Sequence, residues 1–209
     1  MVQIKQDARP KPRGRPREYD PETALQRATE VFWKTGYAGA SLDEISAATG
    51  MNRPSLRAAF GDKHALYLKA LRRYWDLKFA TMREALEDQP LEAALMCVYD
   101  AALAIYFSGE KTARSCFVVG TAITEAAEDP EIQRIVMDGF KRLDAAFETR
   151  LRTAREAGEL GRDADLSTLA MLATATMHTI AVRARAGAAR DDLRAFALRA
   201  VRVICGKAA

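Results

Sequence analysis

Residues 41–64, SLDEISAATGMNRPSLRAAFGDKH, constrain the fold more than any other segment of the chain. Ser41 and Glu44 have the spacing of a capping box, in which each side chain bonds the other residue's backbone amide at the start of a helix. The predicted helix is short and stops at Gly50, which can adopt the positive φ that a tight turn requires. Asn52 then suits the cap of a second short helix. The segment therefore predicts two short helices joined by a tight turn.

The second of these helices has the features of one that enters the major groove of duplex DNA. Leu56 and Phe60 share its inward face, whereas its first turn is polar and basic. Arg53 is the candidate to read a base, because its planar fork matches the O6 and N7 atoms of guanine. A phosphate contact, or a plain exposed arginine, is the alternative. The predicted DNA-reading residues are Asn52, Arg53, Pro54 and Ser55.

The N-terminal arm, residues 1–17, is a second indication of DNA binding. It carries six basic residues and one acid, whereas the whole chain has a net charge of only +4. This composition, without hydrophobic periodicity, predicts a disordered basic arm. Its Arg13-Gly14-Arg15-Pro16 core is like an AT-hook, whose flat arginines lie in a narrow A·T minor groove; a solubilising tail is the alternative. The predicted arm contacts are Arg13, Gly14, Arg15 and Arg17.

The remaining sequence predicts further helices and no sheet. From Ile132 to Leu151 apolar residues recur at helical spacing, with charged residues on the other face. Leu166–Ala186 and Asp191–Ile204 are two more expected helices, and no run of alternating β-branched residues indicates a strand. We therefore expect an all-α fold, with a three-helix helix-turn-helix domain followed by a larger helical domain.

The composition excludes several classes of protein. Cys97, Cys116 and Cys205 are far apart and odd in number, which predicts neither a disulfide framework nor a zinc site and indicates a reducing, cytoplasmic compartment. No apolar stretch near the start indicates a leader, and none approaches the roughly 20 residues of a membrane span. With only two histidines, no nucleophile elbow and no phosphate loop, the chain is not expected to be an enzyme, or to hold a metal or cofactor.

Residues 20–70 resemble the DNA-binding domain of the TetR family of bacterial transcriptional regulators. The resemblance implies a DNA-binding domain at 18–66 and an effector-binding and dimerisation domain at 67–209. The positions that carry it are Ala28, Phe32, Gly36, Tyr37, Ser41, Leu42, Asp43, Glu44, Ile45, Gly50, Met51, Asn52, Arg53, Pro54, Ser55, Leu56, Phe60, Lys63, Ala65 and Leu66.

The resemblance also implies DNA phosphate contacts from Tyr37, Ser41 and Lys63. Physical chemistry supports Ser41 and Lys63, because a helix N-terminus attracts anions. A simple helix cap and a solvated charge are the alternatives. Where family members usually carry aromatic residues after the leucine, this chain has Arg57 and two alanines. Aromatic phosphate contacts are therefore not implied there, and we hypothesise that Arg57 replaces them electrostatically.

The larger domain is implied to bind a small-molecule effector of unknown identity and, through its last two helices, a second copy of the chain. Cys116, in an apolar segment, is either a buried thiol or a sensor of oxidants or electrophiles. His178 is either a core histidine or a ligand contact. The candidate pocket residues are Tyr106, Phe107, Cys116, Phe117, Phe140 and His178.

The leading functional prediction is a repressor that binds a palindromic operator as a homodimer and leaves the DNA when its effector binds. One alternative is an architectural DNA-binding protein that tolerates most sequences. Another is a redox or electrophile sensor that acts through Cys116. The expected partners are thus double-stranded DNA, a second copy of the chain and a small molecule.

Overall fold

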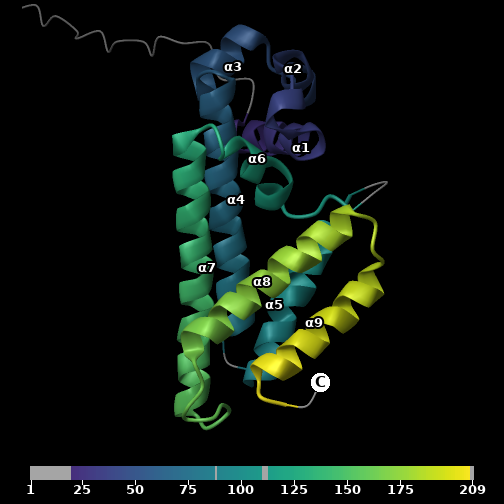
Figure 1. The fold of residues 1–209 in the computed structure, drawn as a ribbon. Coiled ribbons are helices and arrows are strands. Elements are labelled where there is room, and N and C mark those ends of the chain that lie inside the picture. The colour runs from purple at the N-terminus through teal and green to yellow at the C-terminus, as the bar shows by residue number, and fades with distance from the viewer. Residues whose placement is uncertain (1–19, 88, 110–112, 208–209) are drawn as a thin grey trace, which may run out of the picture.

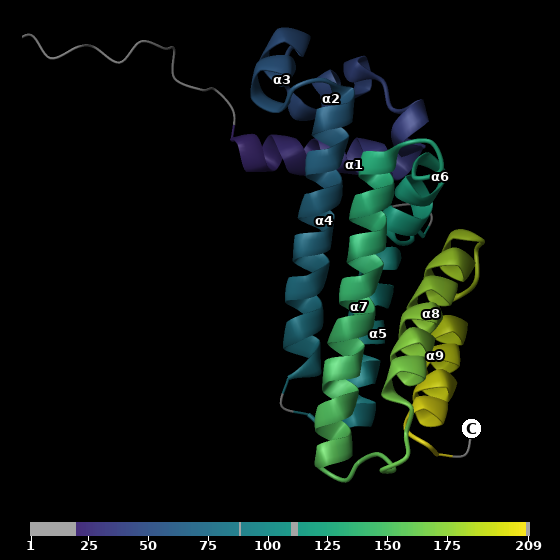
Figure 2. The same ribbon diagram turned by 60° about the vertical axis from the view of Figure 1, so that its left-hand side comes forward.

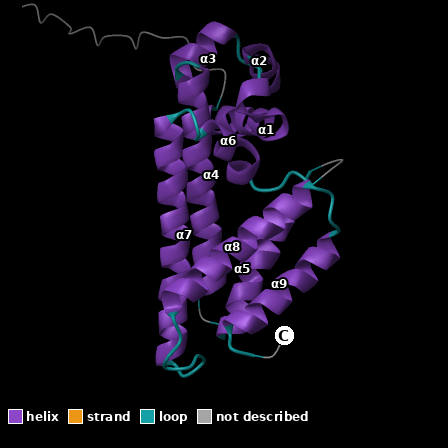
Figure 3. Cartoon of the chain, in the orientation of Figure 1, coloured by secondary structure: helices purple, strands orange, loops and turns teal. Residues whose placement is uncertain are grey.

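The computed structural model describes residues 20–87, 89–109 and 113–207, which form helices joined by loops (Figure 1, Figure 3). No strand occurs in these ranges, and the all-α prediction is confirmed. The elements are α1 (Pro21–Gly39), α2 (Leu42–Thr49), α3 (Arg53–Phe60), α4 (Lys63–Leu86), α5 (Leu91–Tyr106), the π-helix η1 (Val118–Ala122), α6 (Ile123–Glu125), α7 (Pro130–Glu156), α8 (Leu166–Arg185) and α9 (Arg190–Ile204). Outside the described residues lie the predicted arm contacts Arg13, Gly14, Arg15 and Arg17.

The start of α1 and the break near its end both occur at residues whose chemistry favours them there. Asp20 Oδ2 accepts a hydrogen bond from the amide of Thr23 at 2.8 Å, and Pro21 occupies the first turn of α1. The helix breaks at Gly36, whose φ of 76° is not helical, before a last turn that ends at Gly39. Figures 1 and 2 show α1, α2 and α3 gathered at one end of the molecule, around the N-terminal end of α4.

Helix α4 joins the two parts of the chain. It begins at Lys63, directly after α3, and continues to Leu86, so the domain boundary predicted between residues 66 and 67 falls within a continuous helix. Both views show α4 and α7 side by side along the molecule, with α8 and α9 to one side of this pair (Figures 1 and 2). Because α4 is continuous, a tilt of its lower half also moves the end that carries α2 and α3.

An aromatic cluster connects α1 and α4 with the segment that leads into η1. Phe32 meets Tyr67 edge to face at a centroid distance of 5.1 Å, and Trp33 meets Tyr74 at 5.3 Å and Phe117 at 5.5 Å. All five side chains are buried. Edge-to-face pairs each contribute about 0.5–1.5 kcal/mol beyond the burial of their area. The N-terminal helices and the larger helical part therefore share one hydrophobic core.

Candidate nucleic-acid interface

The turn between α2 and α3 has the geometry that its sequence predicts. The amide of Glu44 donates to Ser41 Oγ at 3.1 Å, and the amide of Ser41 donates to Glu44 Oε2 at 2.9 Å, which completes the capping box. Gly50 adopts a φ of 70° at the end of α2. Asn52 Oδ1 accepts a hydrogen bond from the amide of Ser55 at 2.8 Å and caps α3. The helix-turn-helix is confirmed down to its capping groups.

Helix α3 is anchored on one face and open on the other. Leu56 and Phe60 are buried against the core and hold its inner face. A helix held in this way can enter the major groove, which is about 12 Å wide, with its outer face free to meet base edges. The first three of the predicted base-reading residues are exposed and the fourth is partly exposed: Asn52, Arg53, Pro54 and Ser55.

Asp43 of α2 holds the side chain of Arg53. Arg53 Nε and one terminal nitrogen donate to the two carboxylate oxygens at 2.8 and 2.5 Å, and this hydrogen-bonded partner raises the pKa of Arg53. The side chains of Arg53 and Asp43 are 59% and 74% exposed. An ion pair this exposed contributes at most about 1 kcal/mol to stability. The edge of a guanine base can therefore replace the carboxylate as the partner of Arg53. Asp43 had no predicted side-chain role, because a contact ten residues apart across a turn leaves no periodic signal.

Of the residues predicted to contact phosphate, Ser41 and Lys63 lie at the N-terminal ends of α2 and α4, whereas Tyr37 lies near the end of α1 and Arg57 lies on α3. Lys63 Nζ lies 4.8 Å from the ring centroid of Tyr37 and donates to the carbonyl oxygen of Ala38 at 3.4 Å. Tyr37 and Lys63 therefore form one half-buried cationic site next to α2. Ser41 is exposed at the start of α2, and Arg57 is exposed on α3. Phosphate binding by these four residues stays a prediction.

A polar contact ties the start of α4 to the start of α7. His64 Nε2 lies 2.6 Å from Asp129 Oδ2. Asp129 Oδ1 accepts from the amides of Glu131 and Ile132 at 2.9 and 3.1 Å and so caps α7. These hydrogen bonds, that of Ile132 foremost, lower the pKa of Asp129. Sequence reasoning missed this link because its partners are 65 residues apart.

The predicted pocket residues do not form one cluster. The hydroxyl of Tyr74 donates to Cys116 Sγ at 3.2 Å, beside Tyr106. The rings of Phe140 on α7 and His178 on α8 pack at a centroid distance of 4.6 Å, tilted by 52°. Burial, together with the neighbouring Lys78, lowers the pKa of His178 to about 4. Phe117 is a fully buried member of the aromatic cluster described above, and Phe107 lies at the end of α5.

A small cavity of about 20 Å³ lies between α4, α5 and α8. Tyr106 lines it, together with Lys78 and apolar side chains such as Met82 and Met177. The Tyr106 hydroxyl is buried and has no hydrogen-bond partner among the described residues, and burial lowers the pKa of Lys78. The cavity therefore combines apolar walls with two polar groups. The predicted pocket residues that do not line it are Phe107, Cys116, Phe117, Phe140 and His178.

The three cysteines differ in exposure. Cys97 is exposed, Cys116 is buried and Cys205 is partly buried, and all three are free thiols. Within residues 20–87, 89–109 and 113–207, no group of three or more His, Cys, Asp or Glu side chains is placed to hold a metal ion. No helix in these ranges has both the length and the apolar character needed to cross a membrane.

Two family models match the chain. Residues 24–70 match the model described as bacterial regulatory proteins, tetR family, and residues 92–201 match the model described as tetracyclin repressor-like, C-terminal domain. The first match covers α2, the turn and α3, and the second begins in α5 and ends in α9. The resemblance stated from the sequence is therefore confirmed for both parts of the chain.

Curated relatives and a solved structure agree with these matches. The chain is 32% identical over 183 residues to YezE, an HTH-type transcriptional regulator of Bacillus subtilis, which covers 87% of this chain and 94% of YezE. It is 30% identical over 190 residues to the HTH-type transcriptional repressor ComR of Escherichia coli, which covers 90% of each chain. A cysteine mutant of the TetR family regulator CifR, complexed with double-strand operator DNA, matches with a TM-score of 0.81, at 32% identity, over 90% of this chain and 98% of that chain. The chain thus belongs to the TetR family and is a DNA-binding transcriptional regulator, not an enzyme.

Proposed function

We propose that the chain is a repressor that binds a palindromic operator as a homodimer and leaves it when a small-molecule effector binds. The observation that carries the proposal is the open first turn of α3, with Arg53 at the surface and Leu56 and Phe60 anchoring the helix from behind. Two relatives support it: ComR is a repressor, and CifR is complexed with double-strand operator DNA. The basic arm at 1–17 would add contacts in the minor groove.

Helices α8 and α9 provide the surface for the second copy. Met171, Ala175 and Val182 follow one exposed stripe of α8, and Val203 is exposed on α9. Met171 and Val182 are 61% and 54% exposed, which is unusual for large apolar side chains unless a partner covers them. Ala175 lets a facing helix approach closely. Two copies joined here would carry two α3 helices to successive major grooves.

The effector site that fits this proposal is the cavity at Tyr106 and Lys78. A ligand that enlarges it must push on Tyr74, Lys78 and Met82, which all belong to α4. Because α4 continues into the helix-turn-helix, this push would change the separation of the two α3 helices. The ligand can release DNA in this way only if it binds the displaced conformation more tightly than the operator-binding one.

The operator contact is tested with labelled DNA taken from beside the protein's own gene. Fluorescence anisotropy with competitor DNA measures the specificity ratio, and site selection compares wild type with Arg53→Ala. The variant should lose about 1–3 kcal/mol of preference at one base pair. Arg152→Ala, in the half of α7 far from the DNA-reading end, is the matched control and should change nothing. Identical selection profiles for Arg53→Ala and wild type would refute base reading, and a specificity ratio near one would favour the architectural alternative.

The dimer is tested by sedimentation of Val182→Glu. This exposed substitution should leave the helix content unchanged, halve the mass and reduce operator affinity. Leu77→Glu is the matched control, because Leu77 is 52% exposed on α4, away from α8 and α9. A Val182→Glu protein that remains a dimer at the same concentration would remove α8 from the proposed interface.

The Cys116 sensor alternative has little support from the geometry. The thiol is 3% exposed, and its sulfur already accepts a hydrogen bond from Tyr74. A sensor thiol needs access and a cationic neighbour that stabilises the thiolate. We expect Cys116→Ser to keep operator binding and its response to oxidants unchanged in an anisotropy titration.

A further inference from the structure

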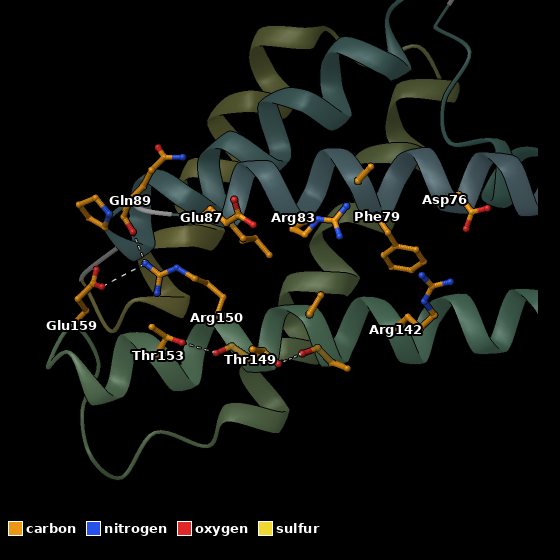
Figure 4. A pocket seen from close by; sticks show the side chains of 15 residues that line it. Asp76, Phe79, Arg83, Glu87, Gln89, Arg142, Thr149, Arg150, Thr153 and Glu159 are labelled. Atoms are coloured by element: carbon orange, nitrogen blue, oxygen red, sulfur yellow. Dashed lines mark hydrogen bonds and ion pairs between the residues drawn. The ribbon is translucent and has the colours of Figure 1, made fainter.

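A long groove runs between α4 and α7, apart from the cavity at Tyr106 (Figure 4). The two helices touch most closely where the ring of Trp75 covers Gly139. Beyond this contact the groove opens, from Asp76 at one end to Glu159 at the other, with a volume of about 1250 Å³. Small-molecule sites in proteins are typically about 300–1,000 Å³, so the groove has room for one. None of its lining residues belongs to α8 or α9, which carry the proposed dimer surface.

Arg150 is the buried polar group of this groove. Its side chain is only 10% exposed, and one terminal nitrogen donates to the carbonyl oxygen of Gln89 at 2.5 Å and lies 3.5 Å from Glu159 Oε1. The other terminal nitrogen is buried and has no hydrogen-bond partner among the described residues. Buried hydrogen-bond donors are nearly always paired, and leaving a charged donor unpaired is especially costly. An acceptor atom supplied by a ligand would therefore be favourable at this nitrogen.

Two further arginines enter the groove from opposite walls. Arg83 comes from α4 and Arg142 from α7, and both are exposed. The guanidinium of Arg142 lies 3.9 Å from the ring centroid of Phe79, a stacking that fixes its plane and leaves its N–H groups free to donate. Figure 4 shows Arg83, Phe79 and Arg142 near one another in the part of the groove toward Asp76.

The walls between the arginines include apolar side chains, and two of the three lining acids lie at the ends of the groove. Ala80, Ala145 and Ala146 line the groove beside Phe79, whose ring is covered by Arg142 and packs on Trp75. Figure 4 places Asp76 and Glu159 at its two ends. Glu159 is also occupied, because its other oxygen accepts the amide of Leu91 at 2.5 Å. The third acid, Glu87, caps the C-terminal end of α4 and is exposed.

We propose that this groove is a second small-molecule site, for an amphipathic organic anion with an aromatic body and a carboxylate, sulfonate or phosphate group. The aromatic body lies against the alanines of the two walls, Ala80, Ala145 and Ala146. The acidic group accepts hydrogen bonds from Arg83 and Arg142, since guanidinium forks match such oxygens, and the unpaired nitrogen of Arg150 offers a further donor toward the Glu159 end of the groove. The site lies outside the proposed effector cavity and does not depend on repression or dimerisation.

The test uses the full-length protein and anilinonaphthalene sulfonate, whose fluorescence rises when it leaves water. Its uncharged counterpart phenylnaphthylamine, which lacks the sulfonate, is titrated in parallel. Arg83→Ala and Arg142→Ala should each weaken binding of the sulfonate about tenfold, the usual loss for one charge-assisted hydrogen bond, and should leave phenylnaphthylamine nearly unchanged. Ala145→Trp, at an exposed position of the groove, should block both probes.

Two variants serve as controls. Arg152→Ala removes an equivalent arginine of α7 that does not line the groove, and Lys78→Met removes the cation of the effector cavity. Both should bind the sulfonate as wild type does. Unchanged sulfonate binding in Arg83→Ala, Arg142→Ala and Ala145→Trp would overturn the proposal. So would binding that only Lys78→Met abolishes, because the probe would then occupy the effector cavity.

Discussion

Replacing Gly139 by alanine tests how tightly α4 is held to α7. A Cβ at Gly139 would lie 2.7 Å from Cη2 of Trp75 and closer still to Cε2 and Cζ2 of the same ring, whereas carbon atoms in contact prefer about 3.5–4.0 Å. The ring has little room to move, because Trp75 is 3% exposed and packs against Phe79 and Phe140 at centroid distances of 5.4 and 6.1 Å. The steric effect is therefore destabilising.

A second effect has the opposite sign. Alanine is favoured over glycine in a helix interior by about 0.5–1 kcal/mol, and Gly139 lies in the middle of α7. Forcing an extra carbon into a packed core costs about 1–3 kcal/mol, and contact with a rigid aromatic ring belongs at the upper end of that range. The steric term wins, so we expect Gly139→Ala to lower the free energy of unfolding by about 2 kcal/mol. For a chain of this length, that lowers Tm by about 4–8 °C.

Urea and thermal denaturation of Gly139→Ala, Gly39→Ala, Trp75→Leu and the double variant measure these terms. Gly39→Ala is the control, because its Cβ would lie at an ordinary 3.5 Å from Thr35 Cβ. The double variant Trp75→Leu/Gly139→Ala removes the obstructing ring, so Gly139→Ala should cost nothing in the Trp75→Leu background. A Gly139→Ala protein as stable as wild type, or an equal loss in both backgrounds, would refute the steric reasoning.

Three further predictions concern titration, capping and DNA. The pKa of His178 is about 4 in the folded chain but about 6.5 when unfolded, so the folded state binds fewer protons between these two pH values. The free energy of unfolding, measured by urea titration, should therefore fall by about 3 kcal/mol from above pH 6.5 to pH 4. His178→Phe should flatten this pH dependence. Asp129→Ala removes the cap of α7 and should lower the free energy of unfolding by about 1–2 kcal/mol, whereas Asp129→Asn should recover most of it. Asp43→Ala frees Arg53 and should tighten operator binding by at most about fivefold in anisotropy measurements; weaker binding would mean that Asp43 positions Arg53 for the base.

The parts of the site that could be predicted from the sequence are those formed by residues close together in the chain. Ser41 and Glu44 are three residues apart, and so are Asn52 and Ser55, so their hydrogen bonds form as soon as the helices do. Gly50 supplies the positive φ of the turn by its own chemistry. The helix-turn-helix could therefore be predicted in detail before the rest of the chain was placed.

The structure does not bring the predicted pocket residues into one cluster, and the reason is physical. Phe117 and Phe140 are both apolar residues at helical spacing, yet Phe117 is a fully buried core residue and Phe140 packs on His178. Periodicity identifies the inward face of a helix but does not show whether that face meets another side chain or a cavity. None of the arginines that line the groove was singled out, since Arg83 and Arg142 come from helices that meet only in the folded chain.

The sequence alone determined the all-α class, the capped helix-turn-helix and the exposed polar face of α3 that we propose meets DNA, because those features depend on backbone chemistry and contacts within a few residues. The tertiary structure decided where Arg53 rests, how His64 and Asp129 tie α4 to α7, and which charged side chains share a groove. The contact of Arg53 with Asp43 joins residues 10 positions apart, and that of His64 with Asp129 joins residues 65 positions apart. Their geometry exists only once helix packing has fixed the distance between elements.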